Sequence, residues 1–194
     1  MYNIPQSIKI NNKEFAIRNK GDYRMVLDCF NALEDETLTE NERIMASVII
    51  FYADINCVED IRKLPNYDVA VIEMFKFFNC GQTESPGMQV NYKLIDWERD
   101  SQLVCSAINK VANKEIRAEP YMHWWTFMGY YLSIGESSLS TVLGIRNKIK
   151  KGKKLEKYEQ EFRVNNPQYF NWDSRTVKEK EADAYLEKIW NKEK

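Results

Sequence analysis

The sequence predicts a mainly α-helical single domain with a small N-terminal β-hairpin and a charged C-terminal helical extension. Three observations predict this class. Most apolar residues recur at helical spacing, period-two alternation is confined to one N-terminal segment, and the charge pattern changes near residue 147. A chain of 194 residues is long enough for one domain with a core, and its 13% aromatic residues can fill a helical core. We expect a domain over residues 1–147 and a basic-to-mixed-charge arm over residues 148–194.

The alternating segment spans residues 8–17 and has Asn11-Asn12 at its centre. Asparagine tolerates the positive φ that tight hairpin turns require, so we predict a β-hairpin here. After Gly21-Asp22, apolar residues recur at helical spacing from Met25 to Leu33, which predicts the first helix. Thr39 followed by Glu42 is a capping-box pattern, and it predicts a second helix directly afterwards.

Apolar periodicity predicts further helices along the rest of the domain. The acidic residues Asp96, Glu98 and Asp100 fit the first turn of one of them, where the helix dipole favours carboxylates. Asp96 and Asp100 could also hold a cation or act as acid and base, but the dipole explanation is favoured. The predicted helices span residues 69–78, 96–113, 120–134 and 138–147, with a loop at 81–87.

The charged extension begins with a segment that we call the basic arm, Arg146 to Arg163. It carries eight basic and three acidic residues, and we expect it to be solvated. The whole chain has a net charge of -1 and no global field for polyanions, so an acidic protein partner is favoured over nucleic acid. The last stretch, Ser174 to Lys194, could form a helix if a partner covers its weak apolar stripe.

The cysteines and the hydropathy pattern favour a soluble intracellular protein. No two of the four cysteines are spaced as a close zinc-binding pair, and no secretory signal or membrane-spanning run is present. We therefore expect reduced, buried thiols without a metal, and no membrane partner. The four residues are Cys29, Cys57, Cys80 and Cys105.

No pattern in the chain predicts catalysis. His123 is the only histidine, and neither a G-x-S-x-G elbow nor a glycine-rich phosphate-binding motif is present. A metal site at His123 would lack a second histidine or a nearby cysteine, so a packed or hydrogen-bonded histidine is favoured. We expect no enzyme activity and no cofactor.

The pair Trp124-Trp125 suggests a binding surface. Successive residues on a helix point about 100 degrees apart, so one ring can enter the core while the other lies at its edge as an interface anchor, although a second core residue is equally consistent. Together with the basic arm, this predicts partner-binding residues at Trp124, Trp125, Phe127, Arg146, Lys150 and Lys154.

Several segments resemble the bacteriophage gene-product-fifteen family of siphophages that infect Gram-positive hosts. The resemblance covers about residues 7–165. It rests on the predicted hairpin, the helix entry at Asp22-Tyr23-Arg24, the segments 77–81 and 92–100, and the helix end from Ser140 to Arg146. The strongest part is Met122-His123-Trp124-Trp125-Thr126-Phe127-Met128.

This resemblance implies a tail-assembly chaperone that transiently binds the tape-measure protein in the host cytoplasm. The tail-tube protein is a second partner to consider, and self-association stays open. The family offers no catalytic residues to carry over. The alternatives are a structural virion protein of the tail or head-tail connector, and a nucleic-acid-binding regulator that uses the basic arm.

Overall fold

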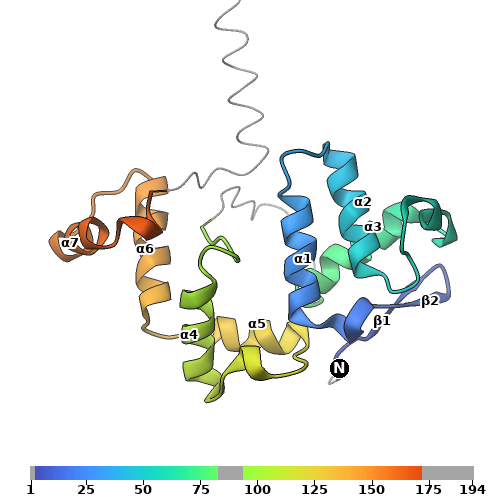
Figure 1. Cartoon of the computed structure of the whole chain (residues 1–194), viewed down its shortest axis with the longest axis horizontal. Coiled ribbons are helices and arrows are strands. Elements are labelled where there is room, and N and C mark those ends of the chain that lie inside the picture. The colour runs from blue at the N-terminus through green and yellow to red at the C-terminus, as the bar shows by residue number, and fades with distance from the viewer. Residues whose placement is uncertain (1–2, 83–93, 172–194) are drawn as a thin grey trace, which may run out of the picture. The chain divides into compact units, whose positions relative to one another are not determined.

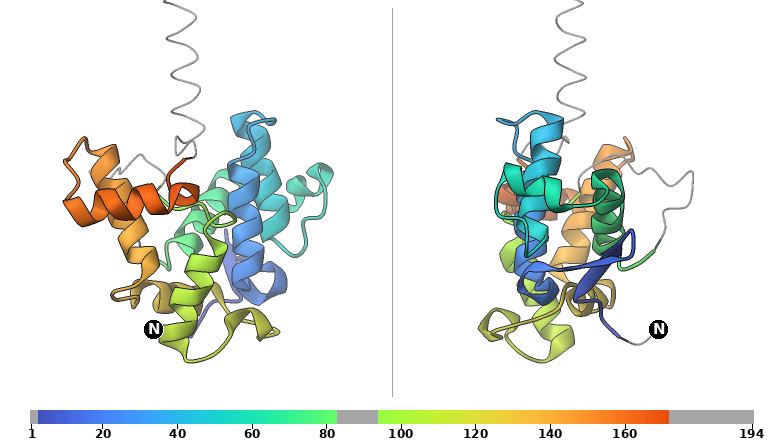
Figure 2. Two further views of the ribbon diagram at one scale, coloured as in Figure 1. Left: turned by 60° about the vertical axis from the view of Figure 1, so that its left-hand side comes forward. Right: turned by 90° about the vertical axis from the view of Figure 1, so that its right-hand side faces the viewer.

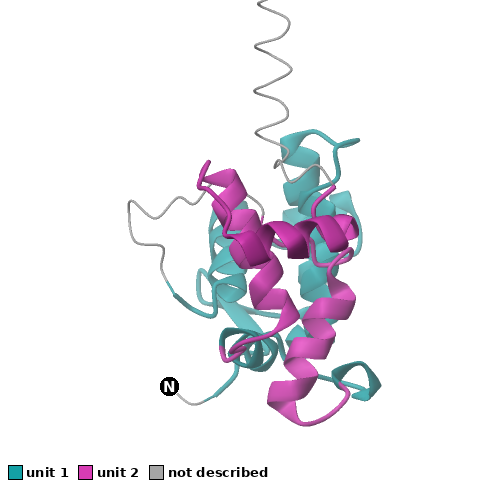
Figure 3. Cartoon of the chain, turned by 90° about the vertical axis from the view of Figure 1, so that its left-hand side faces the viewer, with its two compact units in different colours: residues 1–88, 116–132 teal, residues 89–115, 133–194 magenta. Residues whose placement is uncertain are grey.

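The computed structural model describes residues 3–82 and 94–171. They are mainly α-helical with one N-terminal hairpin, which confirms the predicted fold class (Figure 1). The chain divides into two compact units, residues 1–88 with 116–132 and residues 89–115 with 133–194 (Figure 3). The predicted helix after Ser174 and most of the predicted loop at 81–87 lie outside the described residues. The domain division at residue 147 stays a prediction.

The hairpin of unit 1 pairs β1 (Ser7–Ile10) with β2 (Lys13–Ala16) in antiparallel register. Asn11 and Asn12 form the turn with φ of 46° and 67°, as the sequence predicts. Alternation places Ile10 and Phe15 in the core. The hairpin therefore contributes apolar side chains to a helical unit.

Two capped helices follow and lie side by side (Figures 1 and 2). Helix α1 (Tyr23–Leu33) begins at Asp22, whose carboxylate accepts a hydrogen bond from the Arg24 amide. Helix α2 (Glu40–Phe51) begins with the predicted capping box between Thr39 and Glu42. Both helix starts are confirmed, because each depends on side chains only a few residues away.

Two more α-helices and several 3-10 turns belong to unit 1. Helix α3 (Tyr67–Phe78) is capped by Asn66, and the 3-10 turns η2 (Val58–Lys63) and η3 (Ile116–Ala118) lie before α3 and α5. Helix α5 spans Trp124–Leu132, so the prediction that it begins near Pro120 is wrong. It begins later because the segment before it forms bridges with residues near Asp22.

Unit 2 contains α4 (Ser101–Ala112), α6 (Ser138–Lys150), α7 (Lys157–Asn165) and the 3-10 turn η4 (Pro167–Tyr169). The prediction that α4 begins at Asp96 is wrong. The Asp100 carboxylate accepts from the Asp96 amide, and the Asp96 carboxylate accepts from the Arg99 amide, so these residues form turns before the helix. Helix α7 shows that the predicted C-terminal arm is helical in part.

The cysteines divide into two pairs by exposure. Cys29 and Cys105 are buried, as predicted for small apolar side chains. The prediction of burial is wrong for Cys57, which is exposed, and for Cys80, which is half-buried. Cys57 immediately precedes η2 and Cys80 follows α3 by two residues, so both lie in connecting segments, where less of the chain covers the side chain.

Candidate functional site

His123 is buried at the start of α5 and holds two backbone segments of unit 1. Its Nδ1 lies 3.1 Å from the Trp125 amide, and its Nε2 lies 2.9 Å from the Pro5 carbonyl oxygen. A backbone amide can only donate, so Nδ1 is the acceptor, and in the neutral ring Nε2–H donates to Pro5. Burial lowers the pKa of His123, although the Pro5 hydrogen bond and the charge of Asp22 oppose this effect. The geometry therefore fits a neutral structural imidazole.

The two tryptophans beside His123 cap the end of α3. The Trp124 indole Nε1–H donates to the Phe78 carbonyl and the Trp125 indole Nε1–H donates to the Phe77 carbonyl, both at 2.9 Å. The last carbonyls of a helix lack intrahelical partners, so these indoles supply missing donors. Two motifs that are separate in the sequence, residues 77–81 and 122–128, thus form one cluster.

Gly21 makes room for this cluster. It has φ of +78°, and a Cβ atom there would lie 2.8 Å from Phe77 Cζ and 2.9 Å from His123 Nε2. Both the backbone conformation and the close approach favour glycine. We call Gly21, Phe77, Phe78, His123, Trp124 and Trp125 the His123 cluster.

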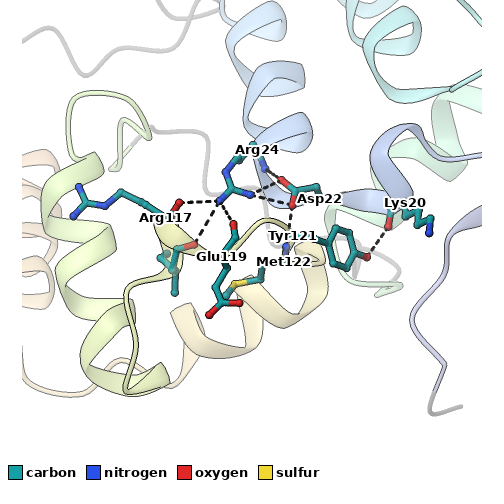
Figure 4. A network of polar contacts seen from close by, with 8 residues as sticks. Lys20, Asp22, Arg24, Arg117, Glu119, Tyr121 and Met122 are labelled. Atoms are coloured by element: carbon teal, nitrogen blue, oxygen red, sulfur yellow. Dashed lines mark hydrogen bonds and ion pairs between the residues drawn. The ribbon is translucent and has the colours of Figure 1, made fainter.

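A polar network joins the start of α1 to the chain before α5 (Figure 4). The Asp22 carboxylate accepts from the Met122 amide at 2.9 Å and pairs with the Arg24 guanidinium at 3.1 Å. Arg24 also donates to the Glu119 carbonyl at 2.8 Å. Because Asp22 is buried, these donors stabilise its negative charge where water cannot.

A charged cluster occupies the core of unit 2. The Arg146 guanidinium donates to both Asp100 oxygens, at 2.6 and 3.0 Å, and Asp100 is fully buried. Arg146 also donates to the Leu94 and Tyr169 carbonyls, each within 2.9 Å. We call these four residues the Arg146 cluster, and it joins α4, α6 and η4.

The predicted partner-binding residues have very different exposures. Trp124 and Phe127 are each 1% exposed, and Trp125 and Lys150 are half-buried. Lys154 is exposed. Arg146 is 6% exposed, so the prediction of a solvated arm beginning at Arg146 is wrong. Its guanidinium belongs to the core because Asp100 neutralises it there.

Sequence reasoning missed the arginines that bind backbone carbonyls. Arg18 donates to the carbonyls of Ile49, Ile50, Tyr52 and Ile55, at the end of α2. The five donors of a guanidinium suit such a group of acceptors. No local pattern marks these contacts, because the acceptors lie more than thirty residues away along the chain.

In the described part of the chain, no three His, Cys, Asp or Glu side chains come together where they could hold a metal ion. None of the helices in residues 3–82 and 94–171 has the length and apolar character needed to cross a bilayer.

The fold and the His123 cluster together define a mainly helical protein whose aromatic motifs hold α3 against the start of α5. The chain belongs to the family described as Bacteriophage Gp15 protein, whose model matches residues 2–169. This match confirms the resemblance to the bacteriophage gene-product-fifteen family. Comparisons with curated proteins and with solved structures gave no match.

Proposed function

We propose that this phage protein is a tail-assembly chaperone of a siphophage with a Gram-positive host, and that it binds the tape-measure protein in the host cytoplasm. The observation that carries the proposal is the exposure of apolar side chains on its helices. Ile72 on α3 is 54% exposed and Leu132 on α5 is 73% exposed. Such side chains gain free energy when a partner removes them from water.

The face of α3 illustrates how a partner chain would bind. Ile72 and Phe75 are both exposed and lie one helical turn apart, so they form a short apolar stripe. An amphipathic helix can dock such a stripe with its own apolar face. A tape-measure segment that is helical and prone to aggregate would thereby be shielded.

The proposal includes a purely binding role, without catalysis or a cofactor. His123, Trp124 and Trp125 use their ring nitrogens in hydrogen bonds with backbone groups. Their role is to hold the scaffold that presents the exposed helical faces. The tail-tube protein is a second proposed partner, recruited while the tape-measure chain is bound.

Co-expression with the tape-measure protein of the same phage tests this function. The full-length protein should increase the soluble fraction of that chain and co-purify with it. Ile72→Ser with Phe75→Ser should reduce the yield of the complex, while Lys9→Gln with Lys20→Gln serves as an exposed control. An unchanged soluble fraction and no co-purification would contradict the proposal.

A structural virion protein of the tail or head-tail connector remains the alternative. Mass spectrometry of purified virions separates it from a chaperone, because a chaperone leaves before the particle is complete. Detection at a stoichiometry comparable to that of tail proteins would favour the structural role.

A further inference from the structure

A hollow beside α7 combines aliphatic and polar walls. It has a volume of about 370 Å³ and is lined by Leu155, Gln160, Arg163 and Val164. Val164 is 76% exposed and Leu155 is half-buried. The volume lies within the range of ligand-binding clefts, roughly 300–1,000 Å³. An aliphatic side chain of a partner would find apolar contacts here that water does not provide.

Helix α7 is held in place by contacts with the end of α6. Lys148 Nζ lies 2.8 Å from the Glu159 carboxylate, and Glu159 also accepts from the Glu156 amide at 2.9 Å. Glu159 is buried, and Lys148 neutralises its negative charge through this ion pair. Glu159 therefore adds no negative charge to the exposed surface. The contacts fix the first turn of the helix that forms one wall of the hollow.

Residues 151–164, the described segment that contains the lining of the hollow, carry an excess of exposed positive charge. The exposed carboxylates in this region are Glu156 and Glu161, and they are fewer than the exposed cationic side chains. Those cationic residues are Lys151, Lys153, Lys154, Lys157 and Arg163. A hollow with two aliphatic walls and nearby cationic side chains is complementary to an acidic segment that carries an aliphatic side chain.

We propose that this hollow binds an acidic amphipathic helix of a partner protein. An aliphatic side chain of that helix enters between Leu155 and Val164, and its carboxylates face Lys154 and Lys157. The identity of the partner rests on the proposed function, in which the helix belongs to the tape-measure chain. The chemistry of the hollow does not depend on that identity.

Nucleic acid fits this surface less well than an acidic helix. The lining residues Leu155, Gln160, Arg163 and Val164 include no aromatic ring on which a base could stack, and the exposed Tyr158 of α7 is not among them. Glu156 and Glu161 interrupt the positive charge, and each would repel a phosphate. Apolar walls instead favour burial of an aliphatic side chain.

Fluorescence anisotropy with the full-length protein tests the hollow directly. The probe is a labelled synthetic helix with leucine at i, i+3, i+4 and i+7 and glutamate at its flanks. Lys154→Gln with Lys157→Gln should weaken binding about tenfold at low salt. Val164→Ser should weaken it about fivefold. Because these side chains are exposed, circular dichroism should show an unchanged fold.

The matched control is Lys9→Gln with Lys20→Gln, which removes two exposed lysines from unit 1 and should leave binding unchanged. A probe with lysine in place of glutamate should not bind. The proposal is overturned if the wild-type protein does not bind the acidic probe, or if the control variant loses binding equally. Tighter binding of a single-stranded oligonucleotide would overturn it too, as would self-association that is abolished by the hollow variants, Lys154→Gln with Lys157→Gln and Val164→Ser.

Co-purification separates this inference from the proposed function. If the tape-measure chain co-purifies equally with the wild type and the hollow variants, the hollow is not its binding site, while the chaperone function stands. If the acidic probe binds and the tape-measure chain does not, the chaperone function fails, while the acidic-helix site stands.

Discussion

The His123 cluster of unit 1 and the Arg146 cluster of unit 2 both hold separate chain segments, but by different chemistry. In unit 1, neutral ring N–H groups donate to the carbonyls of Pro5, Phe77 and Phe78. In unit 2, a buried guanidinium binds a buried carboxylate and two further carbonyls. Loss of a neutral donor leaves one polar atom unsatisfied, whereas loss of an ionic partner leaves a buried charge. Unit 2 should therefore tolerate substitution of its cluster less well.

The largest effect should come from Arg146→Met. It leaves the fully buried Asp100 carboxylate without its guanidinium, so we expect unfolding free energy to fall by about 3–5 kcal/mol. Urea denaturation followed by circular dichroism measures the change. Arg146 also holds Leu94 and Tyr169, so protection from amide exchange should fall around both residues.

A double variant isolates the charge from the packing. Asp100→Leu with Arg146→Met removes both charges, and its cost should be smaller than the sum of the single costs by about 2 kcal/mol. Additive costs would mean that the two side chains stabilise unit 2 independently. In that case the Arg146 cluster would not depend on its ion pair, and it would not differ from the neutral His123 cluster in the way proposed.

Gly21→Ala should have the next largest effect, through crowding in the His123 cluster. The new Cβ would lie under 3 Å from both Phe77 and His123, and alanine disfavours φ of +78°. We expect a loss of about 2–3 kcal/mol. The control is Gly129→Ala in α5, where a Cβ meets nothing within 4 Å. That substitution should stabilise the helix by about 0.5–1 kcal/mol, since alanine is the better helix former.

The distance along the chain between contacting residues explains which parts of the fold could be predicted from the sequence. The hairpin turn at Asn11-Asn12 and the capping box at Thr39 were predictable because their contacts are local. The start of α4 was not, because the Asp100 carboxylate points to Arg146, 46 residues further along the chain. The lysines that follow Arg146 indicate a solvated arm, and only the folded chain places Arg146 in the core.

The site was also predicted only in part. The sequence favoured a packed or hydrogen-bonded role for His123, and its contacts with Pro5 and Trp125 fit that interpretation. It did not reveal that Trp124 and Trp125 cap α3, because that contact joins segments 46 and 48 residues apart. The hollow beside α7 was missed too. Leu155, Gln160 and Arg163 belong to the basic arm and Val164 directly follows it, and the many charged residues of this segment give it no apolar periodicity that would predict a hollow.

A smaller effect should separate the two tryptophans. Trp124→Phe removes the indole donor to Phe78 in a buried position and should cost about 2 kcal/mol. Trp125→Phe should cost about 0.5–1 kcal/mol, because Trp125 is half-buried and the Phe77 carbonyl also accepts from the Cys80 amide. Thermal unfolding of both variants measures the difference. Equal costs would show that the carbonyl bonds contribute little.

The smallest effect should be the pH dependence of the neutral cluster. Burial holds the pKa of His123 below its ordinary value of 6.5, so the folded state favours the neutral ring. The unfolded chain takes up this proton first as the pH falls, and stability should therefore decline from about pH 7 downwards, before the carboxylates titrate. His123 is the only histidine, so His123→Asn should flatten the profile between pH 7 and 5. If stability still declines between pH 7 and 5 in His123→Asn, another group is titrating. The His123 cluster would then not be the source of the pH dependence.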